Sequence, residues 1–211
     1  MKNLNMLLLT SVLAAPAAPA LAQSSGSGPG ESNFSYSTLG FQLGKATPDE
    51  EIIFFGERYE DFGAASIGGS VQLADNFAIG GSAGSISNEG PRTELSTTTV
   101  SLNFFVPVPM GDRVDLVPRI GYVSTEVEGC LDNVCAKEDD SALAYGVGMR
   151  LWAIPDGLEL NAAFSDSNAD NSESVLSLGL AGWVNKHHRF GLDFETSDSI
   201  NAVLVGYSYN W

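Results

Sequence analysis

The sequence predicts an all-β protein, a closed antiparallel up-and-down transmembrane β-barrel of about ten strands, with eight possible. Three observations predict it. Large apolar residues alternate with small or polar ones through one segment after another. The connections between these segments are alternately short and long, and the acidic residues gather mainly in the long ones. The polar face of the segments consists chiefly of Ser, Gly, Ala, Thr and Asn rather than charged residues.

Residues 1–22 have the pattern of a secretory signal peptide. Lys2 gives a positive start, an apolar stretch follows, and the Ala-Leu-Ala of residues 20–22 forms a small-x-small cleavage site. The apolar stretch is broken by prolines and is too short for a transmembrane helix. We therefore expect cleavage after residue 22, a flexible Gly/Ser-rich leader over residues 23–32, and a barrel domain over residues 33–211.

The first half of the predicted barrel contains five strands. Residues 34–44 alternate Leu and Phe with Thr, Gly and Gln, and residues 62–73 alternate Ile, Val and Leu with Ser, Gly and Gln. Residues 77–87 form a strand rich in Gly, Ala and Ser. In residues 94–106, Val, Leu and Phe oppose Thr, Ser and Asn, whereas residues 114–127 place Leu, Ile and Tyr opposite Asp, Arg and Gly. A period of two is typical of strands with one apolar face.

The second half contains five more strands. Residues 142–154 show the cleanest alternation, with Leu, Tyr, Val and Met opposite Ala, Gly and Arg. Residues 158–165 follow, residues 176–184 alternate Leu176, Leu178, Leu180 and Val184 with Ser, Gly and Ala, and residues 190–195 alternate Phe and Leu with Gly, Asp and Glu. The last strand, residues 199–211, places its large residues at Val203, Val205, Tyr207, Tyr209 and Trp211. A terminal aromatic stripe suits a closing strand that faces lipid better than one that faces water.

The connections predict which end of the barrel lies on which side of the membrane. Tight periplasmic turns are expected at 74–76, 107–112, 155–157 and 185–188, and longer acidic external connections at 45–61, 126–140 and 166–173. The apolar residues 52–55 fall inside the first long connection. They either extend the strands beyond the membrane or fold over the barrel mouth, and the pattern does not choose between the two.

The composition of the polar face favours a membrane barrel over a soluble one. A soluble sheet would carry Lys, Glu and Arg on that face, yet Lys45, Lys137 and Lys186 are all expected in connections. Small residues suit the crowded interior of a narrow barrel. A lipocalin-like soluble binding barrel is the alternative, in which the large apolar residues would line a central cavity.

The mature chain resembles the small single-chain outer-membrane β-barrels of Gram-negative bacteria, the group that holds opacity-type porins and the OmpA transmembrane domain. The resemblance rests on the signal peptide, the amphipathic hairpins and the C-terminal V-L-V-G-Y-S-Y-N-W. It implies an outer-membrane location in contact with lipid and lipopolysaccharide, and recognition of the C-terminal strand by the barrel-assembly machinery. It departs from OmpA in having nothing after Trp211, so an anchoring domain is not expected.

Cys130 and Cys135 enclose four residues and are the only cysteines. In an oxidising compartment we expect a disulfide that closes this short loop. A metal pair or redox couple lacks partner ligands nearby in the sequence, so we expect no metal or cofactor there.

Charged residues on the inward face form the candidate site. They are Asp115, Arg119, Arg150, Glu159, Asp193 and Glu195. Buried charges must be paired, so they are expected to form an internal salt-bridge plug. A narrow polar pathway whose charges select ions is the alternative.

Two further patterns are weak candidates for chemistry. His187 and His188 are adjacent in a predicted periplasmic turn, where neighbouring side chains point apart and do not share a metal easily. Residues 166–171 imitate the start of a calcium loop, but Asn171 and Ser177 stand where that loop needs Gly and Glu. Acidic external loops have a weaker expected role, which is to hold divalent cations that bridge lipopolysaccharide phosphates.

The sequence therefore predicts a structural or surface barrel without catalysis, with a narrow porin for ions or small polar solutes as the alternative. A net charge of −16 and only 10 Lys and Arg residues exclude a nucleic-acid partner, since phosphates need basic side chains to neutralise them.

Overall fold

The computed structural model describes residues 32–132, 134–169 and 172–211. The expected signal peptide lies outside these residues, as does the expected leader except for Ser32, which is buried. Within the described ranges no helix is long and apolar enough to cross a membrane.

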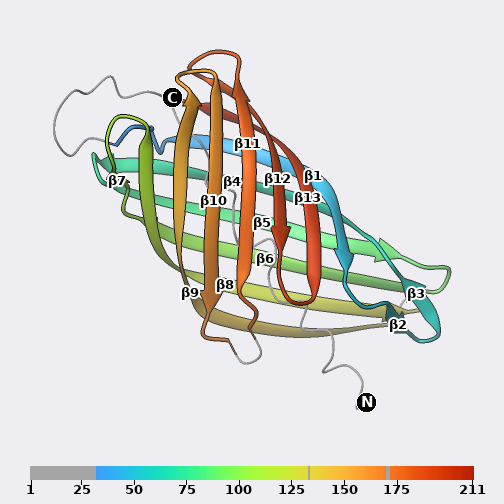
Figure 1. Cartoon of the computed structure of the whole chain (residues 1–211). Coiled ribbons are helices and arrows are strands. Elements are labelled where there is room, and N and C mark those ends of the chain that lie inside the picture. Colours follow the sequence, from blue (N-terminus) through green and yellow to red (C-terminus); the bar gives the residue numbers. More distant parts are fainter. Residues whose placement is uncertain (1–31, 133, 170–171) are drawn as a thin grey trace.

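Ten long antiparallel strands close into one barrel (Figure 1). In order they are β1 (Thr38–Pro48), β4 (Phe62–Ala74), β5 (Phe77–Glu89), β6 (Thr93–Phe105), β8 (Val114–Leu131), β9 (Val134–Ile154), β10 (Leu158–Ser167), β11 (Val175–Trp183), β12 (His188–Thr196) and β13 (Ile200–Asn210). Each pairs with the strands before and after it, and β13 pairs with β1 from Asn210↔Thr38 to Ile200↔Pro48. The predicted up-and-down barrel is confirmed, with ten strands rather than eight.

Three short strands complete the fold. A small hairpin of β2 (Ile52–Phe54) and β3 (Glu57–Tyr59) lies in the connection between β1 and β4, and among the described strands β7 (Val108–Pro109) pairs only with β8. We call the end of the barrel with the connections 75–76, 106–113, 155–157 and 184–187 the short-turn end, and the opposite end the long-loop end.

The large apolar residues point outward and the small polar ones point inward. Val147 and Met149 are 39% and 44% exposed on the outer surface of the barrel. Thr97, Thr99 and Asn103 are buried inside it. The lipocalin-like alternative requires the opposite sidedness and is therefore wrong. A closed barrel satisfies its backbone groups internally, so it tolerates acyl chains around this apolar surface.

The expected loop at 126–140 is instead a strand extension. Strands β8 and β9 stay paired from Val114↔Leu151 to Leu131↔Val134, far past the end of β10 at Ser167↔Ala144 (Figure 1). Acidic side chains did not end these strands, because charge is costly on a strand only where it meets lipid. For the same reason the prediction that lysines avoid strands is wrong for Lys45 and Lys137, which lie near the long-loop ends of β1 and β9.

The start of the barrel also differs from expectation. Residues 34–36 do not belong to the first strand, which begins at Thr38. Phe34 and Tyr36 are buried within the barrel instead, at 0% and 2% exposure. The sequence pattern does not distinguish a segment that lies inside the lumen from a strand of the barrel wall, because both show alternating burial.

Leu178 lies at the middle of β11 with its side chain 47% exposed on the apolar surface. We expect Leu178→Arg to lower the free energy of unfolding in lipid bilayers by about 2–4 kcal/mol, because the guanidinium would have to be buried among acyl chains. Urea unfolding of the barrel refolded in vesicles measures this change. Val134→Arg is the control, since Val134 is 76% exposed at the far tip of the β8–β9 extension, and it should change stability by less than about 0.5 kcal/mol. Equal losses in the two variants would contradict the assigned sidedness.

Candidate functional site

A buried ion-pair network lies in the lumen near the short-turn end. Glu159 on β10 is fully buried and lies between Arg150 on β9 and Arg189 on β12. Its Oε1 accepts a hydrogen bond from Arg150 Nε at 2.9 Å, with the second Arg150 nitrogen at 2.6 Å. Its Oε2 lies 3.4 Å from Arg189 Nε and accepts a bond from Trp183 Nε1 at 3.2 Å. Two cations and one anion are thus held together out of contact with water.

The segment that precedes β1 fills the lumen on the short-turn side of this network. Asp115 Oδ1 accepts hydrogen bonds from the backbone and side-chain nitrogens of Asn33, at 3.0 and 2.9 Å, and its Oδ2 accepts one from the Tyr36 hydroxyl at 3.1 Å. The Phe34 ring stacks on Trp152 with centroids 4.8 Å apart, and the Arg150 guanidinium lies 4.1 Å from the Phe34 centroid. We call residues 32–36 the N-terminal plug.

The remaining inward charges lie on the long-loop side of the network. Asp193 accepts a hydrogen bond from Gln42 Nε2 at 3.1 Å and has Arg189 as a charged neighbour. Glu195 is fully buried, and its charged neighbours are Asp193 and Arg119. Arg119 makes no ion pair within 4 Å among the described residues, and it borders a small cavity whose walls include Asn103 and Ser165.

The β2–β3 hairpin folds over the long-loop mouth of the barrel, which settles the role of residues 52–55. The Tyr59 hydroxyl donates to the Thr93 carbonyl at 2.9 Å, and Glu57 Oε2 accepts from Thr93 N at 3.2 Å. Phe54 is buried in a cluster that also contains Leu95 and Ile200. A Cβ at Gly129 would lie 2.9 Å from Phe54 Cζ, so the glycine makes room for this ring.

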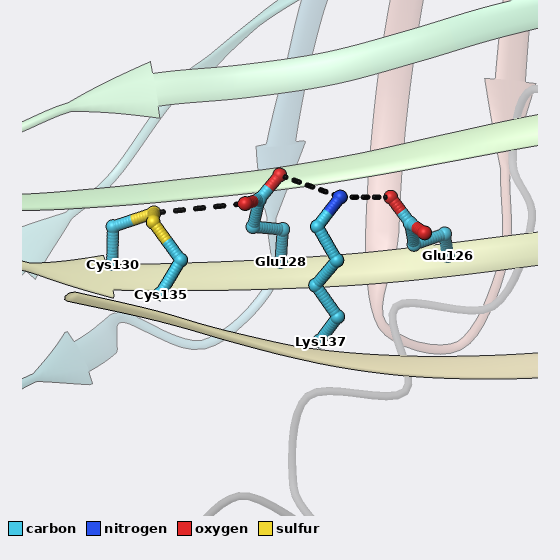
Figure 2. The surroundings of a disulfide bond; sticks show 5 residues. All are labelled: Glu126, Glu128, Cys130, Cys135 and Lys137. Atoms are coloured by element: carbon cyan, nitrogen blue, oxygen red, sulfur yellow. Dashed lines mark hydrogen bonds and ion pairs between the residues drawn. A yellow bond between two sulfur atoms is a disulfide. The ribbon is translucent and has the colours of Figure 1, made fainter. Parts of the chain in front are cut away.

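The disulfide joins Cys130 on β8 to Cys135 on β9, directly across the β8–β9 extension (Figure 2). Glu128 lies beside the two sulfur atoms, and the three side chains are close enough to suggest a metal site. Because both sulfurs are engaged in the disulfide, neither is the thiolate that a metal needs. Figure 2 also shows Lys137 between Glu126 and Glu128, with its Nζ 2.7 Å from Glu126 Oε1 and 3.3 Å from Glu128 Oε2.

We expect the Cys130→Ser/Cys135→Ser double variant to lower the free energy of unfolding by about 2 kcal/mol, because the short covalent ring no longer restricts the unfolded chain. Urea unfolding of the oxidised protein and of the double variant, refolded in the same detergent, gives this difference. Adding a reductant to the native chain should reproduce the double variant and leave the double variant itself unchanged. A reductant effect on the double variant would assign the loss to another cause.

Exposed ion pairs surround the long-loop mouth. Arg92 donates from Nε to Asp132 Oδ1 at 2.9 Å, and its Nη2 donates to Asp132 Oδ2. This hydrogen bonding lowers the pKa of the Asp132 carboxyl and raises that of Arg92. Hydrogen bonding to Lys45 likewise lowers the pKa of Asp61. Asp132 and Asp61 therefore keep their charge in mildly acidic solution, and these pairs persist there.

The side chains of the two weak candidates for chemistry, the histidine pair and the calcium-like segment, make hydrogen bonds within the protein. His187 Nδ1 is 2.7 Å from the Asn210 carbonyl, and His188 Nδ1 is 2.8 Å from the Tyr207 hydroxyl. In the calcium-like segment, Asp166 Oδ1 accepts from Ser167 N at 2.7 Å and Asp166 Oδ2 accepts from Ser174 Oγ at 3.2 Å. Residues 170 and 171 of that segment lie outside the described residues.

The alternation of residues predicted that all six charged residues lie on the inward face of the barrel wall, but it did not identify several of their partners. Arg189 carried a usable signal, because it alternates with the outward Phe190 and shares the inward face with Asp193. Asn33, Phe34 and Tyr36 carried none, since nothing local shows that a chain segment turns back into a lumen.

A closed barrel with an apolar outer surface and a filled polar lumen defines the class of small transmembrane β-barrels. The chain belongs to the family described as outer membrane protein beta-barrel domain, which matches residues 6–210. This family implies the Gram-negative outer membrane. Barrels of this class have short periplasmic turns and longer external loops, so we expect the short-turn end to be periplasmic and the long-loop end to be external.

Solved structures with a similar fold include Ail, the attachment invasion locus protein of Yersinia pestis, at 12% identity over 82% of this chain and 97% of that chain, with a TM-score of 0.45. The N-terminal β-barrel domain of OprF from Pseudomonas aeruginosa is 10% identical over 82% and 98%, with a TM-score of 0.43. The outer membrane protease OmpT of Escherichia coli is 12% identical over 82% and 94%, with a TM-score of 0.49. No functional conclusion follows at these identities. No curated protein matches the chain.

Proposed function

We propose that this protein is an integral outer-membrane barrel with a structural or surface role, that it does not conduct ions steadily, and that it catalyses no reaction. The observation that carries the proposal is the filling of the lumen at three levels. The N-terminal plug closes the periplasmic end, the Arg150–Glu159–Arg189 network occupies part of the interior, and the β2–β3 hairpin covers the external mouth. Ion conduction needs a continuous polar pathway, and each of these layers interrupts one.

Planar-bilayer recording of the refolded protein tests this proposal. We expect no steady single-channel steps, because three layers would have to move at once. A variant that lacks residues 33–36 and has Ser-Gly linkers in place of residues 50–60 should show more frequent transient openings. Steady steps from the native protein would overturn the proposal.

A narrow porin is the second candidate, and the environment of Arg119 favours it. This guanidinium borders a cavity near the external end, has Glu195 as a charged neighbour, and makes no ion pair within 4 Å in the part of the chain that the structure describes. If the native protein conducts, Arg119→Ala should change its ion selectivity, since charges that line a pore select ions. A plug residue would alter stability and leave selectivity unchanged.

The absence of catalysis is supported by the histidines. Both lie at the periplasmic end, and their Nδ1 atoms face a backbone carbonyl and a tyrosine hydroxyl rather than an acid that would activate them. Incubation of the refolded protein with peptide and lipopolysaccharide substrates should leave these substrates intact.

The proposed partners follow from the surface. Outer-membrane lipid and lipopolysaccharide surround the apolar band, and divalent cations bridge lipopolysaccharide phosphates to external acidic residues. The C-terminal strand serves the barrel-assembly machinery through Val203, Val205, Tyr207, Tyr209 and Trp211. All five are at least partly exposed along the outer face of β13 or just beyond it. Cleavage after residue 22 precedes this assembly.

A further inference from the structure

Strand β9 has an unpaired edge outside the barrel. On one side it is bonded to β8 from Leu151↔Val114 up to Val134↔Leu131. On the other side its pairing with β10 stops at Ala144↔Ser167. From Leu143 to Val134, no described strand pairs with this second side.

The hydrogen bonds of the Leu143 backbone show which residues of β9 direct their N–H and C=O groups outward from the free edge. Leu143 N donates to Asn168 Oδ1 at 2.8 Å, and the Leu143 carbonyl accepts from Asn168 N at 3.0 Å. Backbone groups alternate sides along a strand, so Lys137 and Asp139 also direct their N–H and C=O groups away from β8. Cys135 lies in the same row, and its disulfide to β8 holds the end of the edge in place.

The edge lacks most of the devices that normally prevent strand addition. Its register with β8 is continuous, with no bulge from Val134 to Leu151, and residues 134–143 contain no proline. Exposed strand edges with these properties accept a further strand through main-chain hydrogen bonds. The one protective feature is charge, because Glu138, Asp139 and Asp140 follow one another along the edge.

This charge selects among possible occupants. A second copy of the chain would pair the same acidic run with itself, and like charges directly opposite each other destabilise a sheet. A basic strand would instead place its cations beside Glu138 and Asp140, which share one face of β9. Lys137 does not oppose this, since it is already paired with Glu126 and Glu128.

We propose that the β9 edge at residues 135–141 is a docking site for an extended, basic segment of another protein, which adds to the sheet as a further strand. The occupant carries Lys or Arg at alternate positions, and its backbone pairs with Lys137 and Asp139. The site lies outside the lumen, so it is independent of whether the barrel conducts.

Fluorescence anisotropy with a labelled peptide of alternating Lys and Thr tests the site on the full refolded barrel. Asp139→Pro removes an edge N–H without touching the β8 ladder, while Asp139→Asn removes the same charge and keeps the N–H. We expect Asp139→Pro to weaken binding at least about tenfold and Asp139→Asn to weaken it less than about threefold. A Glu138→Gln/Asp140→Asn variant should also bind more weakly, and its binding should depend less on salt.

The same peptide with N-methyl groups at alternate residues carries the same charge but has a blocked edge. It should bind at least about tenfold more weakly than the unmodified peptide. Equal binding of the two peptides, equal binding by Asp139→Pro and native protein, or no binding at all would each overturn the proposal. Dimerisation of the native barrel that Asp139→Pro abolishes would assign the edge to a second copy and equally overturn it.

Discussion

Glu159→Gln is expected to lower the free energy of unfolding by about 3–5 kcal/mol, the largest loss from any single charge in the barrel. The substitution keeps the size of the side chain but leaves Arg150 and Arg189 without the anion that lies between them. Two buried guanidinium groups then face each other in a site that is closed to water. Urea unfolding in detergent micelles, monitored by the loss of the β-sheet circular dichroism signal, measures the difference.

Glu126→Gln is the matched control for this variant. Glu126 also pairs with a cation, Lys137, but both side chains are about half exposed on the β8–β9 extension. Exposed pairs contribute little, so the control should lose less than about 1 kcal/mol. If Glu159→Gln lost no more than Glu126→Gln, water would have to reach the network, and the lumen would not be closed.

Phe34→Ala is expected to cost about 3–5 kcal/mol, the usual loss for a large aromatic side chain removed from a packed site. Phe34 is 0% exposed, stacks on Trp152 and lies under the Arg150 guanidinium, so its removal leaves a cavity and ends a cation–π contact. The variant should also shift the tryptophan emission to longer wavelength as water enters beside Trp152. Urea unfolding together with fluorescence spectra provides both measurements.

Phe55→Ala provides the comparison, since Phe55 is 68% exposed at the turn of the β2–β3 hairpin. It should change stability by less than about 1 kcal/mol and leave the emission unchanged. A Phe34→Ala variant as stable as the native barrel would show that residues 32–36 do not occupy the lumen in solution, and the proposal of a closed periplasmic end would then be wrong.

The fold could be predicted because each strand carries its own evidence. In β9, Val147 and Met149 alternate with Gly146 and Gly148, and this pattern identifies a strand and its two faces without any knowledge of its neighbours. The residue pattern did not predict the strands that continue just outside the membrane. Residues 126–140 resembled an acidic loop because the rule that excludes charge from strands holds only within lipid.

The candidate site could be predicted only in part. Alternation placed Arg150 and Glu159 on inward faces and predicted that the inward charges pair, but it did not say which pairs form. It also marks Arg189 as inward-facing, but it does not reveal the contact with Glu159, because Arg189 lies two strands beyond Glu159 and the contact depends on the stagger of β10, β11 and β12. Nor did it reveal the N-terminal plug, whose partner Asp115 is 82 residues from Asn33 in the chain.

The sequence by itself determined that this chain forms a barrel and which side of every strand meets lipid. Both follow from residues that alternate with a period of two and from the difference in size between alternate side chains. Only the tertiary structure decided what fills the barrel and what remains open at its rim. Those contacts join residues from distant strands and loops, and they depend on the closure of the ring and the unequal lengths of its strands, which no local pattern encodes.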